Sequence, residues 1–276
     1  MSRVQSSTAG TQVLRRVSEI LRFVALNRGA GTRLVDIAEA LQLQPPTAHR
    51  LLQGLVAERL LTRNGTKLYE LGPHLCELGL IAGTHFGLLE FFMPAMDRIV
   101  ETTEDTVVLT VRSGNNGVIA DRRSGAYPVQ ANAVALGARR PLAAGTGGLA
   151  ILSGMQREEA HGVILANAAE LAGKSNNSQD LQHRHKSNAA LRTQVEKART
   201  AGFVVHEMLD TNPPIAAVGV PVFGAYGAPI AGLSVRAVAA RLGPRRRRQV
   251  AGILQSEAAA ITKALRDEAG VVPEVV

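Results

Sequence analysis

A group of mostly polar residues lies at the start of a predicted helix, where the side chains could contact nucleic acid. The helix is expected to run from Pro45 to about Arg59. The residues exposed at or just before its start are Gln44, Pro46, Thr47, His49 and Arg50. An α-helix fits the major groove of DNA, and its N-terminal residues usually meet the base edges. The group could also be a solvated surface of a small helical bundle, but its surroundings favour DNA binding.

A second group that could do chemistry is the run Gly145-Thr146-Gly147-Gly148, which opens a predicted helix reaching about Leu152. Small residues let a ligand approach the backbone. The first N–H groups of a helix have no partner within the helix and attract anions. The run therefore allows an anion site, although a tight turn that needs glycine for packing would give the same pattern.

Catalytic motifs are not found in the sequence. His183 and His185 are two residues apart in a polar stretch, and His161 has no second histidine four residues away, as zinc proteases require. The nucleophile elbow and the phosphate-loop lysine motif are also missing. Cys76 is the only cysteine, so it forms neither an intramolecular disulfide nor a thiolate zinc site. We therefore expect no enzyme activity, no cofactor and no metal.

Three helices are expected to position the first group. Apolar residues recur at three- and four-residue spacing over 11–28, 33–41 and 45–59, which indicates helices. Thr32 is a plausible N-cap for the second of them.

A β-hairpin is expected to follow the third helix. Asn64-Gly65 separates two short β-prone runs, which is the strongest short signal for a hairpin. Three helices and one hairpin form the outline of a winged helix-turn-helix. Arg63 and Lys67 lie on this hairpin, where a wing would follow the DNA backbone.

The rest of the chain is expected to form a mixed domain. Residues 73–103 are predicted to be helical, with a break at Pro94. From residue 106 the hydrophobic period changes to two, which indicates strands. Strands are expected at 106–112, 117–122, 128–132, 203–207, 215–222 and 229–236, and helices at 188–201 and 244–268. The predicted fold class is α+β, with an N-terminal winged helix-turn-helix over 1–72, a linker helix over 73–93 and an antiparallel-sheet domain over 94–276.

The composition supports two domains with a basic head. The chain has 276 residues, 46% of them hydrophobic, and a net charge of +8. Residues 1–75 hold 10 Lys and Arg against 5 Asp and Glu, whereas residues 76–276 hold 21 against 18. This excess suits a polyanionic partner. No apolar run reaches the roughly 18 residues of a membrane-spanning helix, and Met1–Gly10 is polar, so we expect a cytoplasmic protein without membrane contact.

Several motifs, in order along residues 11–265, closely resemble those of the IclR family of bacterial transcription regulators. The predicted third helix reads Thr47-Ala48-His49-Arg50-Leu51-Leu52, and the hairpin closes on Tyr69-Glu70-Leu71-Gly72. The later motifs are Arg140-Pro141-Leu142, Gly202-Phe203, Val220-Pro221-Val222-Phe223 and Leu233-Ser234-Val235. The sequence departs from the family at Pro45 and Pro46, where a hydroxyl or basic residue is usual, and this affects the expected operator sequence.

The resemblance implies a winged helix-turn-helix, a linker helix and a GAF-like effector domain. It implies a homodimer or a dimer of dimers on double-stranded DNA, with operator affinity modulated by a small-molecule effector, an organic or aromatic acid. A constitutive DNA-bound scaffold without an effector is the alternative. Whether the protein represses or activates transcription is left open.

The resemblance also assigns effector contacts. The backbone at Thr146 and Gly147 would bind the oxygens of the acid, and the other pocket positions correspond to Glu207, Ala217, Ser234 and Arg236. Arg236 could pair with a carboxylate. Strand alternation places it on the same face as Ser234. Asp210 is a polar alternative nearby.

Overall fold

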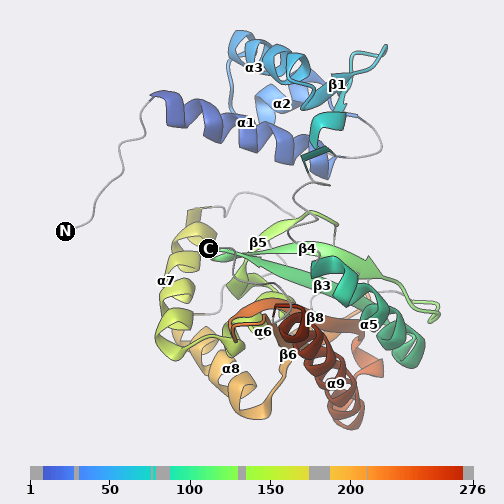
Figure 1. Cartoon of the computed structure of the whole chain (residues 1–276). Helices are drawn as coiled ribbons and strands as arrows, with labels where there is room; N and C mark the ends of the chain where they lie inside the picture. The colour runs from blue at the N-terminus through green and yellow to red at the C-terminus, as the bar shows by residue number, and fades with distance from the viewer. Residues whose placement is uncertain are drawn as a thin grey trace. The chain divides into compact units, whose positions relative to one another are not determined.

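The computed structural model describes residues 9–27, 31–75, 77–78, 88–129, 135–173, 187–209 and 211–269. The chain divides into two compact units, Met1–Gly87 and Leu88–Val276, which are treated separately below (Figure 1). Much of the predicted linker helix over 73–93 lies outside the described residues. Within that range, residues 73–75, 77–78 and 88–93 are helical.

The N-terminal unit contains three helices and a two-stranded antiparallel sheet. These elements are α1 (Ala9–Leu26), α2 (Leu34–Ala40), α3 (Pro45–Ala57), β1 (Leu61–Arg63) and β2 (Tyr69–Leu71). Their buried side chains form one core, made of Ile20, Val24, Ile37, Leu52, Leu55, Leu61 and Tyr69. The predicted winged helix-turn-helix outline is therefore present, with α3 as its third helix and the β1–β2 hairpin as its wing.

The start of α2 differs from the prediction. Arg33 is the N-cap, and its backbone N–H donates to the Asp36 carboxylate at 3.1 Å. Thr32 is buried and its backbone exchanges two hydrogen bonds with Tyr69, of 3.1 and 2.8 Å. Thr32 cannot cap the helix because it forms a bridge to β2, so the long-range pairing overrides its capping preference.

The wing loop also differs from a two-residue turn. It spans residues 64–68, and the residue in the left-handed region is Lys67, with φ of 64°, rather than Gly65. The Asn64 side-chain oxygen accepts hydrogen bonds from the Thr66 N–H at 3.1 Å and the Leu68 N–H at 2.9 Å. Asn64 thus organises the loop with its side chain, as asparagine commonly does in turns.

The C-terminal unit is built on a six-stranded antiparallel sheet in the order β5-β4-β3-β8-β7-β6. The strands are β3 (Thr106–Ser113), β4 (Asn116–Arg123), β5 (Arg139–Pro141), β6 (Val204–Met208), β7 (Ile215–Phe223) and β8 (Pro229–Val238). The helices are α5 (Leu88–Thr103), α6 (Thr146–Gly154), α7 (Arg157–Gly173), α8 (Asn188–Ala201) and α9 (Pro244–Ala269), with short 3₁₀ turns at Leu142–Ala144 and Ala239–Arg241. The α+β class with an antiparallel sheet is confirmed.

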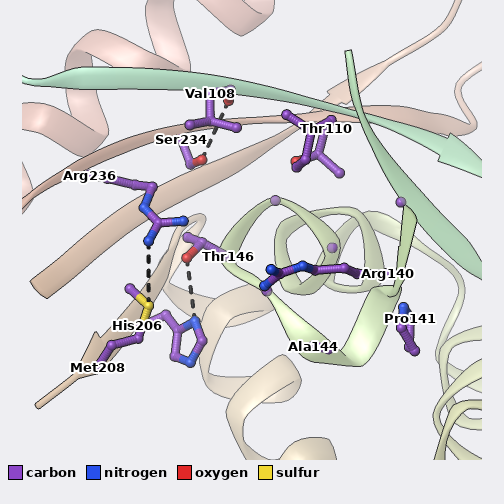
Figure 2. Close-up of a pocket in the computed structure, with 15 residues that line it drawn as sticks. Val108, Thr110, Arg140, Pro141, Ala144, Thr146, His206, Met208, Ser234 and Arg236 are labelled. Atoms are coloured by element: carbon purple, nitrogen blue, oxygen red, sulfur yellow. Dashed lines mark hydrogen bonds between the residues drawn. The ribbon is translucent and has the colours of Figure 1, made fainter. Parts of the chain in front are cut away.

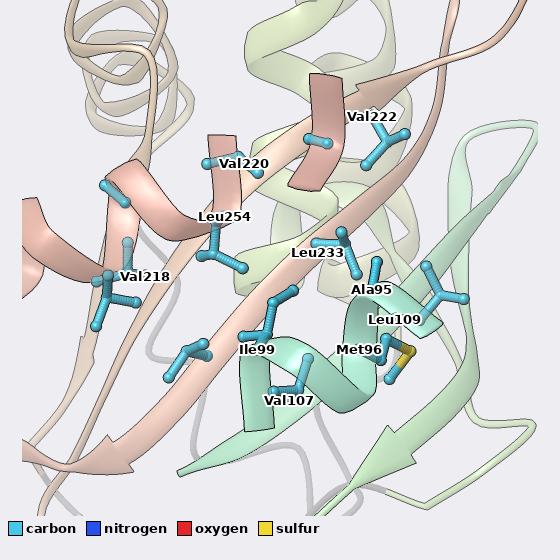
Figure 3. Close-up of a cluster of buried hydrophobic side chains, with 14 of the residues drawn as sticks. Ala95, Met96, Ile99, Val107, Leu109, Val218, Val220, Val222, Leu233 and Leu254 are labelled. Atoms are coloured by element: carbon cyan, nitrogen blue, oxygen red, sulfur yellow. The ribbon is translucent and has the colours of Figure 1, made fainter. Parts of the chain in front are cut away.

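One face of the sheet packs on α5 and α9. Alternate residues of β3, β7 and β8 point to this face, and they form the main core with the apolar sides of the two helices (Figure 3). Pro94 lies inside α5 and does not break it, so the predicted break is wrong. The helix continues because Phe92, Met96 and Ile99, on both sides of the proline, are completely buried in this core.

The other face of the sheet carries α6, and α7 and α8 pack around it in a second apolar cluster. Helix α7 has no counterpart in the prediction. The predicted strand over 128–132 is not supported where it is described, because Pro128 and Val129 form a bend and residues 130–134 lie outside the described part. The edge position next to β4 is taken by β5 instead. Among the described helices, none combines the length and hydropathy needed to cross a bilayer.

Candidate functional site

The predicted DNA contacts lie on the exposed side of α3 and on the wing. Gln44 is the extended N-cap of α3, and Pro45 and Pro46 occupy the first turn of the helix. Backbone N–H groups in this turn have no acceptor within the helix, so proline loses no hydrogen bond there. His49 and Arg50 are exposed, and Thr47 is half-buried. The opposite side of α3 is buried through Ala48, Leu52 and Leu55.

The wing presents its two basic residues to solvent. Arg63 and Lys67 are both exposed. The Arg63 guanidinium lies 5.6 Å from the centre of the Tyr69 ring, a cation–π contact that restrains it. The N-terminal unit therefore has an exposed helix start and a basic hairpin, the two surfaces that a winged helix-turn-helix uses on DNA.

The C-terminal unit holds a cavity of about 60 Å³ between the sheet and the start of α6. Its walls come from β3, β4, β5, β6, β8 and the turn that leads into α6 (Figure 2). The four predicted residues that line it are Thr146, Gly147, Ser234 and Arg236.

The N-terminus of α6 forms one wall of the cavity. Gly145 is its N-cap and gives it no side-chain hydrogen bond, so the first N–H groups of the helix face the cavity without a side-chain cap. A Cβ atom on Gly147 would overlap the Thr110 side chain, and one on Gly232 would overlap the Gly147 carbonyl. The two glycines are therefore needed for the helix start to lie this close to β3 and β8.

Arg236 brings a positive charge into the cavity. Its Nη2 donates only to the Met208 sulfur, at 3.7 Å, and its buried Nε has no partner among the described residues. Burial, and to a smaller extent the nearby charge of Arg140, lower the pKa of Arg236 to about 10. A guanidinium in this position is suited to bind an anion.

The hydroxyl groups of Thr110, Thr146 and Ser234 and the imidazole of His206 complete the polar lining. The Ser234 hydroxyl is buried and lies 3.4 Å from the Val108 carbonyl, to which it donates. Thr146 Oγ1 lies 3.4 Å from His206 Nδ1. Within the described residues, no group of three or more His, Cys, Asp and Glu side chains could hold a metal ion.

Two predicted effector contacts do not line the cavity. Glu207 faces the opposite side of the sheet, where its carboxylate pairs with Arg247 of α9, so its assignment to the pocket is wrong. Ala217 pairs with His206 and Arg236 in the sheet and shares their face, but it is completely buried against Met208 and Ile215. Asp210 lies outside the described residues.

Arg140, His206 and Met208 line the cavity but were not predicted to do so. Strand alternation puts His206 and Met208 on the face opposite Glu207, so assigning Glu207 to the pocket excluded them. For Arg140 no such signal existed, since β5 has only three residues and shows no periodicity.

The sequence matches two family models. Residues 13–65 match the IclR helix-turn-helix domain, and residues 82–263 match the C-terminal domain of the bacterial transcriptional regulator IclR. The second match alone covers more than half of the chain.

Named relatives and solved structures agree with these matches. The HTH-type transcriptional regulator KipR of Bacillus subtilis is 24% identical over 208 residues, which are 75% of this chain and 79% of KipR. An IclR homolog from Microbacterium hydrocarbonoxydans, solved with 4-hydroxybenzoate, has a TM-score of 0.71 at 24% identity, over 92% of this chain and 99% of the other. The IclR structure from Thermotoga maritima has a TM-score of 0.65 at 24% identity and the same coverage. At these identities the two structures show a shared fold.

Proposed function

The chain belongs to the IclR family of bacterial transcriptional regulators, and from this premise we propose that a small organic acid, bound in the cavity at the start of α6, modulates its affinity for an operator. The matched families and relatives are regulators rather than enzymes. The C-terminal unit is accordingly an effector-binding domain, and the N-terminal unit is the DNA-binding domain.

The single observation that carries the effector proposal is the environment of Arg236. Its guanidinium is largely buried, its pKa is lowered by that burial, and no described carboxylate pairs with it. A buried charge without a partner destabilises a fold. A constitutive scaffold would have no use for such a group, whereas a carboxylate ligand would neutralise it next to the N–H groups of α6.

The size of the cavity favours a small aliphatic acid. An engineered protein cavity of about 150 Å³ accommodates benzene, and the cavity here is about 60 Å³. The relative from Microbacterium hydrocarbonoxydans binds 4-hydroxybenzoate. In the present chain an aromatic acid of that size would require Met208 or Arg140 to move, because both side chains occupy the cavity wall.

On the DNA side, we propose that α3 enters the major groove with Gln44, Pro46, Thr47, His49 and Arg50, and that Arg63 and Lys67 contact phosphates. Two such units in a homodimer, or four in a dimer of dimers, would read half-sites roughly 34–36 Å apart or at multiples of that distance. The acid acts by binding one arrangement of the units better than another, since a ligand shifts only equilibria in which its affinities differ.

The test uses the full chain and a labelled duplex from the region upstream of its own gene. Organic acids are first screened for a rise in melting temperature, which a ligand of the folded state must produce. We expect the acids that raise it to change the duplex affinity severalfold in fluorescence anisotropy. They should do neither in Arg236→Met. A protein that prefers no duplex at low ionic strength, with or without these acids, would refute the proposal.

A further inference from the structure

We propose that Met208 is an oxidation site in the cavity at the start of α6, where its sulfoxide oxygen would bind Arg236 and take the position of an acid's carboxylate. A peroxide and an organic acid would then compete for one guanidinium. The competition rests on the proposed function, because it concerns the same cavity. The oxidation itself and its effect on stability are measured without any acid.

The Met208 sulfur is an acceptor for Arg236 in the ligand-free chain. Arg236 Nη2 donates to Met208 Sδ at 3.7 Å, and Figure 2 shows the sulfur directed toward the guanidinium. A thioether sulfur is only a weak acceptor. The buried Nε of Arg236 has no hydrogen-bond partner among the described residues. The guanidinium therefore lies beside a group that satisfies it poorly.

Oxidation turns this weak acceptor into a strong one. Hydrogen peroxide transfers one oxygen atom to the sulfur: the S–O bond forms, the O–O bond breaks, the sulfur loses two electrons and the peroxide leaves as water. The sulfoxide oxygen carries partial negative charge, as a carboxylate oxygen does. The cavity of about 60 Å³ leaves room for one added atom. The three rotatable bonds of a methionine side chain let that atom turn toward Arg236.

The other described methionines lie in different surroundings. Met96 and Met155 are 0% and 1% exposed and belong to the two large apolar clusters of the C-terminal unit. Met93 is 45% exposed on α5. Met208 is 9% exposed and lines the cavity, so a small oxidant can reach a sulfur that already contacts a cation. Oxidation normally disrupts a packed core, but beside Arg236 the new oxygen gains a charged donor.

The experiment treats the full-length, ligand-free protein with dilute hydrogen peroxide, removes the oxidant with catalase and locates each added oxygen by peptide mass spectrometry. We expect Met208 to gain one oxygen atom before Met96 and Met155 do, because those two are buried in apolar clusters. The melting temperature should then rise by about 2–4 °C, the size of shift that one additional hydrogen bond produces in a chain of this length.

Variants assign this rise to the contact between Met208 and Arg236. Met208→Leu is the matched control, because it fills a similar volume and retains Cys76 and the other four of the five methionines, which peroxide also oxidises. Peroxide should not raise its melting temperature. Arg236→Leu removes the donor, so oxidation of Met208 should lower the melting temperature by leaving a buried polar group unpaired. Met208→Gln places an amide oxygen near Arg236 without peroxide, so it should reproduce the rise even if peroxide damages other residues.

The competition is measured with propionate as the acid, by isothermal titration calorimetry on the same proteins. The oxidised wild-type protein and Met208→Gln should bind propionate at least tenfold more weakly than the untreated wild-type protein, because the guanidinium is then occupied. Met208→Leu should bind it within threefold of the untreated wild-type protein, both before and after peroxide.

Four outcomes would overturn parts of this assignment. Met208 is not an oxidation site if it stays unoxidised while Met93 is fully oxidised. The sulfoxide does not bind Arg236 if oxidation fails to raise the melting temperature, or raises it equally in Arg236→Leu. A propionate affinity that oxidation leaves unchanged rules out competition. If the wild-type protein binds neither propionate nor any other acid of the screen, the proposed effector function fails, and the melting temperatures still decide whether the sulfoxide binds Arg236.

Discussion

At the scale of single residues, Arg236 combines a cost to folding with a capacity to bind. Its pKa is about 10, below the ordinary value of an arginine, because burial disfavours the charged form. Below pH 10 the side chain is charged in both the folded and the unfolded chain, so the fold carries the full cost of burying the charge. Between pH 10 and the higher pKa of arginine in the unfolded chain, the unfolded chain binds more protons, and the stability contribution of this residue therefore rises with pH.

Replacing Arg236 with methionine should therefore stabilise the ligand-free protein. Methionine fills a similar space without a charge, and removal of buried charge commonly stabilises a fold by about 1–4 kcal/mol. We expect urea unfolding at neutral pH to show a gain of about 1–3 kcal/mol, together with loss of stabilisation by organic acids. Arg139→Met, at an exposed arginine that donates to the Ser113 hydroxyl, should show no gain. A less stable Arg236→Met protein would mean that the guanidinium is already neutralised in the absence of ligand.

Arg50 should matter more for operator binding than Arg245. Arg50 is exposed near the start of α3, whereas Arg245 lies at the start of α9 in the effector-binding unit. We expect Arg50→Ala to weaken binding of the operator duplex by about 1–3 kcal/mol, the usual range for a base or phosphate contact of this kind. Arg245→Ala should change it much less. Equal losses in anisotropy titrations would contradict the docking of α3 proposed above.

At the scale of elements, the wing is held by Asn64 and carries a residue in an unfavourable conformation. Lys67 has a φ of 64°, which a residue with a Cβ adopts at a cost and glycine adopts freely. Lys67→Gly should therefore keep the loop and stabilise the N-terminal unit slightly. It should also remove a phosphate contact and reduce the slope of log affinity against log salt by about 1. An unchanged salt slope would show that Lys67 does not contact DNA.

The approach of α6 to the sheet depends on glycine. Gly147→Ala places a methyl group on the Thr110 side chain, and such overpacking costs typically about 1–3 kcal/mol. We expect lower stability in urea and weaker acid binding, because the start of α6 must move. Gly162→Ala in α7 is the control, since a Cβ there meets nothing and alanine favours the helix. A fully stable Gly147→Ala protein that binds acid normally would contradict the role given to this contact.

The sequence predicted those elements whose ends carry local signals. Helix α8 runs over 188–201 as expected, because the Ser187 hydroxyl caps its start and Gly202 ends it with a φ of 77°. Strand alternation placed Ser234 and Arg236 on one face, and both line the cavity. DNA and effector contacts by the other predicted residues stay predictions.

The failures come from contacts between distant parts of the chain. Pro94 is kept in a helix by burial on both sides of it, and Thr32 is withdrawn from capping by its bridge to Tyr69. Glu207 was assigned from motif spacing, but Arg247, forty residues later, holds it on the other face. Arg140 enters the cavity from a strand too short to show a pattern. None of these partners can be inferred from neighbouring residues.

At the scale of the whole molecule, the two units must be coupled if an acid controls transcription. Coupling is a free energy shared by two sites, and it acts equally in both directions. If saturating acid changes the affinity for the operator by some factor, saturating operator must change the affinity for the acid by the same factor. This equality requires no knowledge of how the units are arranged, and it separates true regulation from an acid that binds without consequence.

We expect this reciprocity in the full chain, with a factor of about 5–150 as is typical of allosteric proteins. The measurements are operator affinity by anisotropy with and without a saturating acid from the melting-temperature screen, and acid affinity by calorimetry with and without saturating duplex. Arg50→Ala is the control, because it should bind the acid normally while the duplex no longer changes that affinity. If the acid affinity is the same with and without duplex, and the duplex affinity is the same with and without acid, the cavity is a binding site that does not regulate DNA binding, because coupling would have to change both affinities.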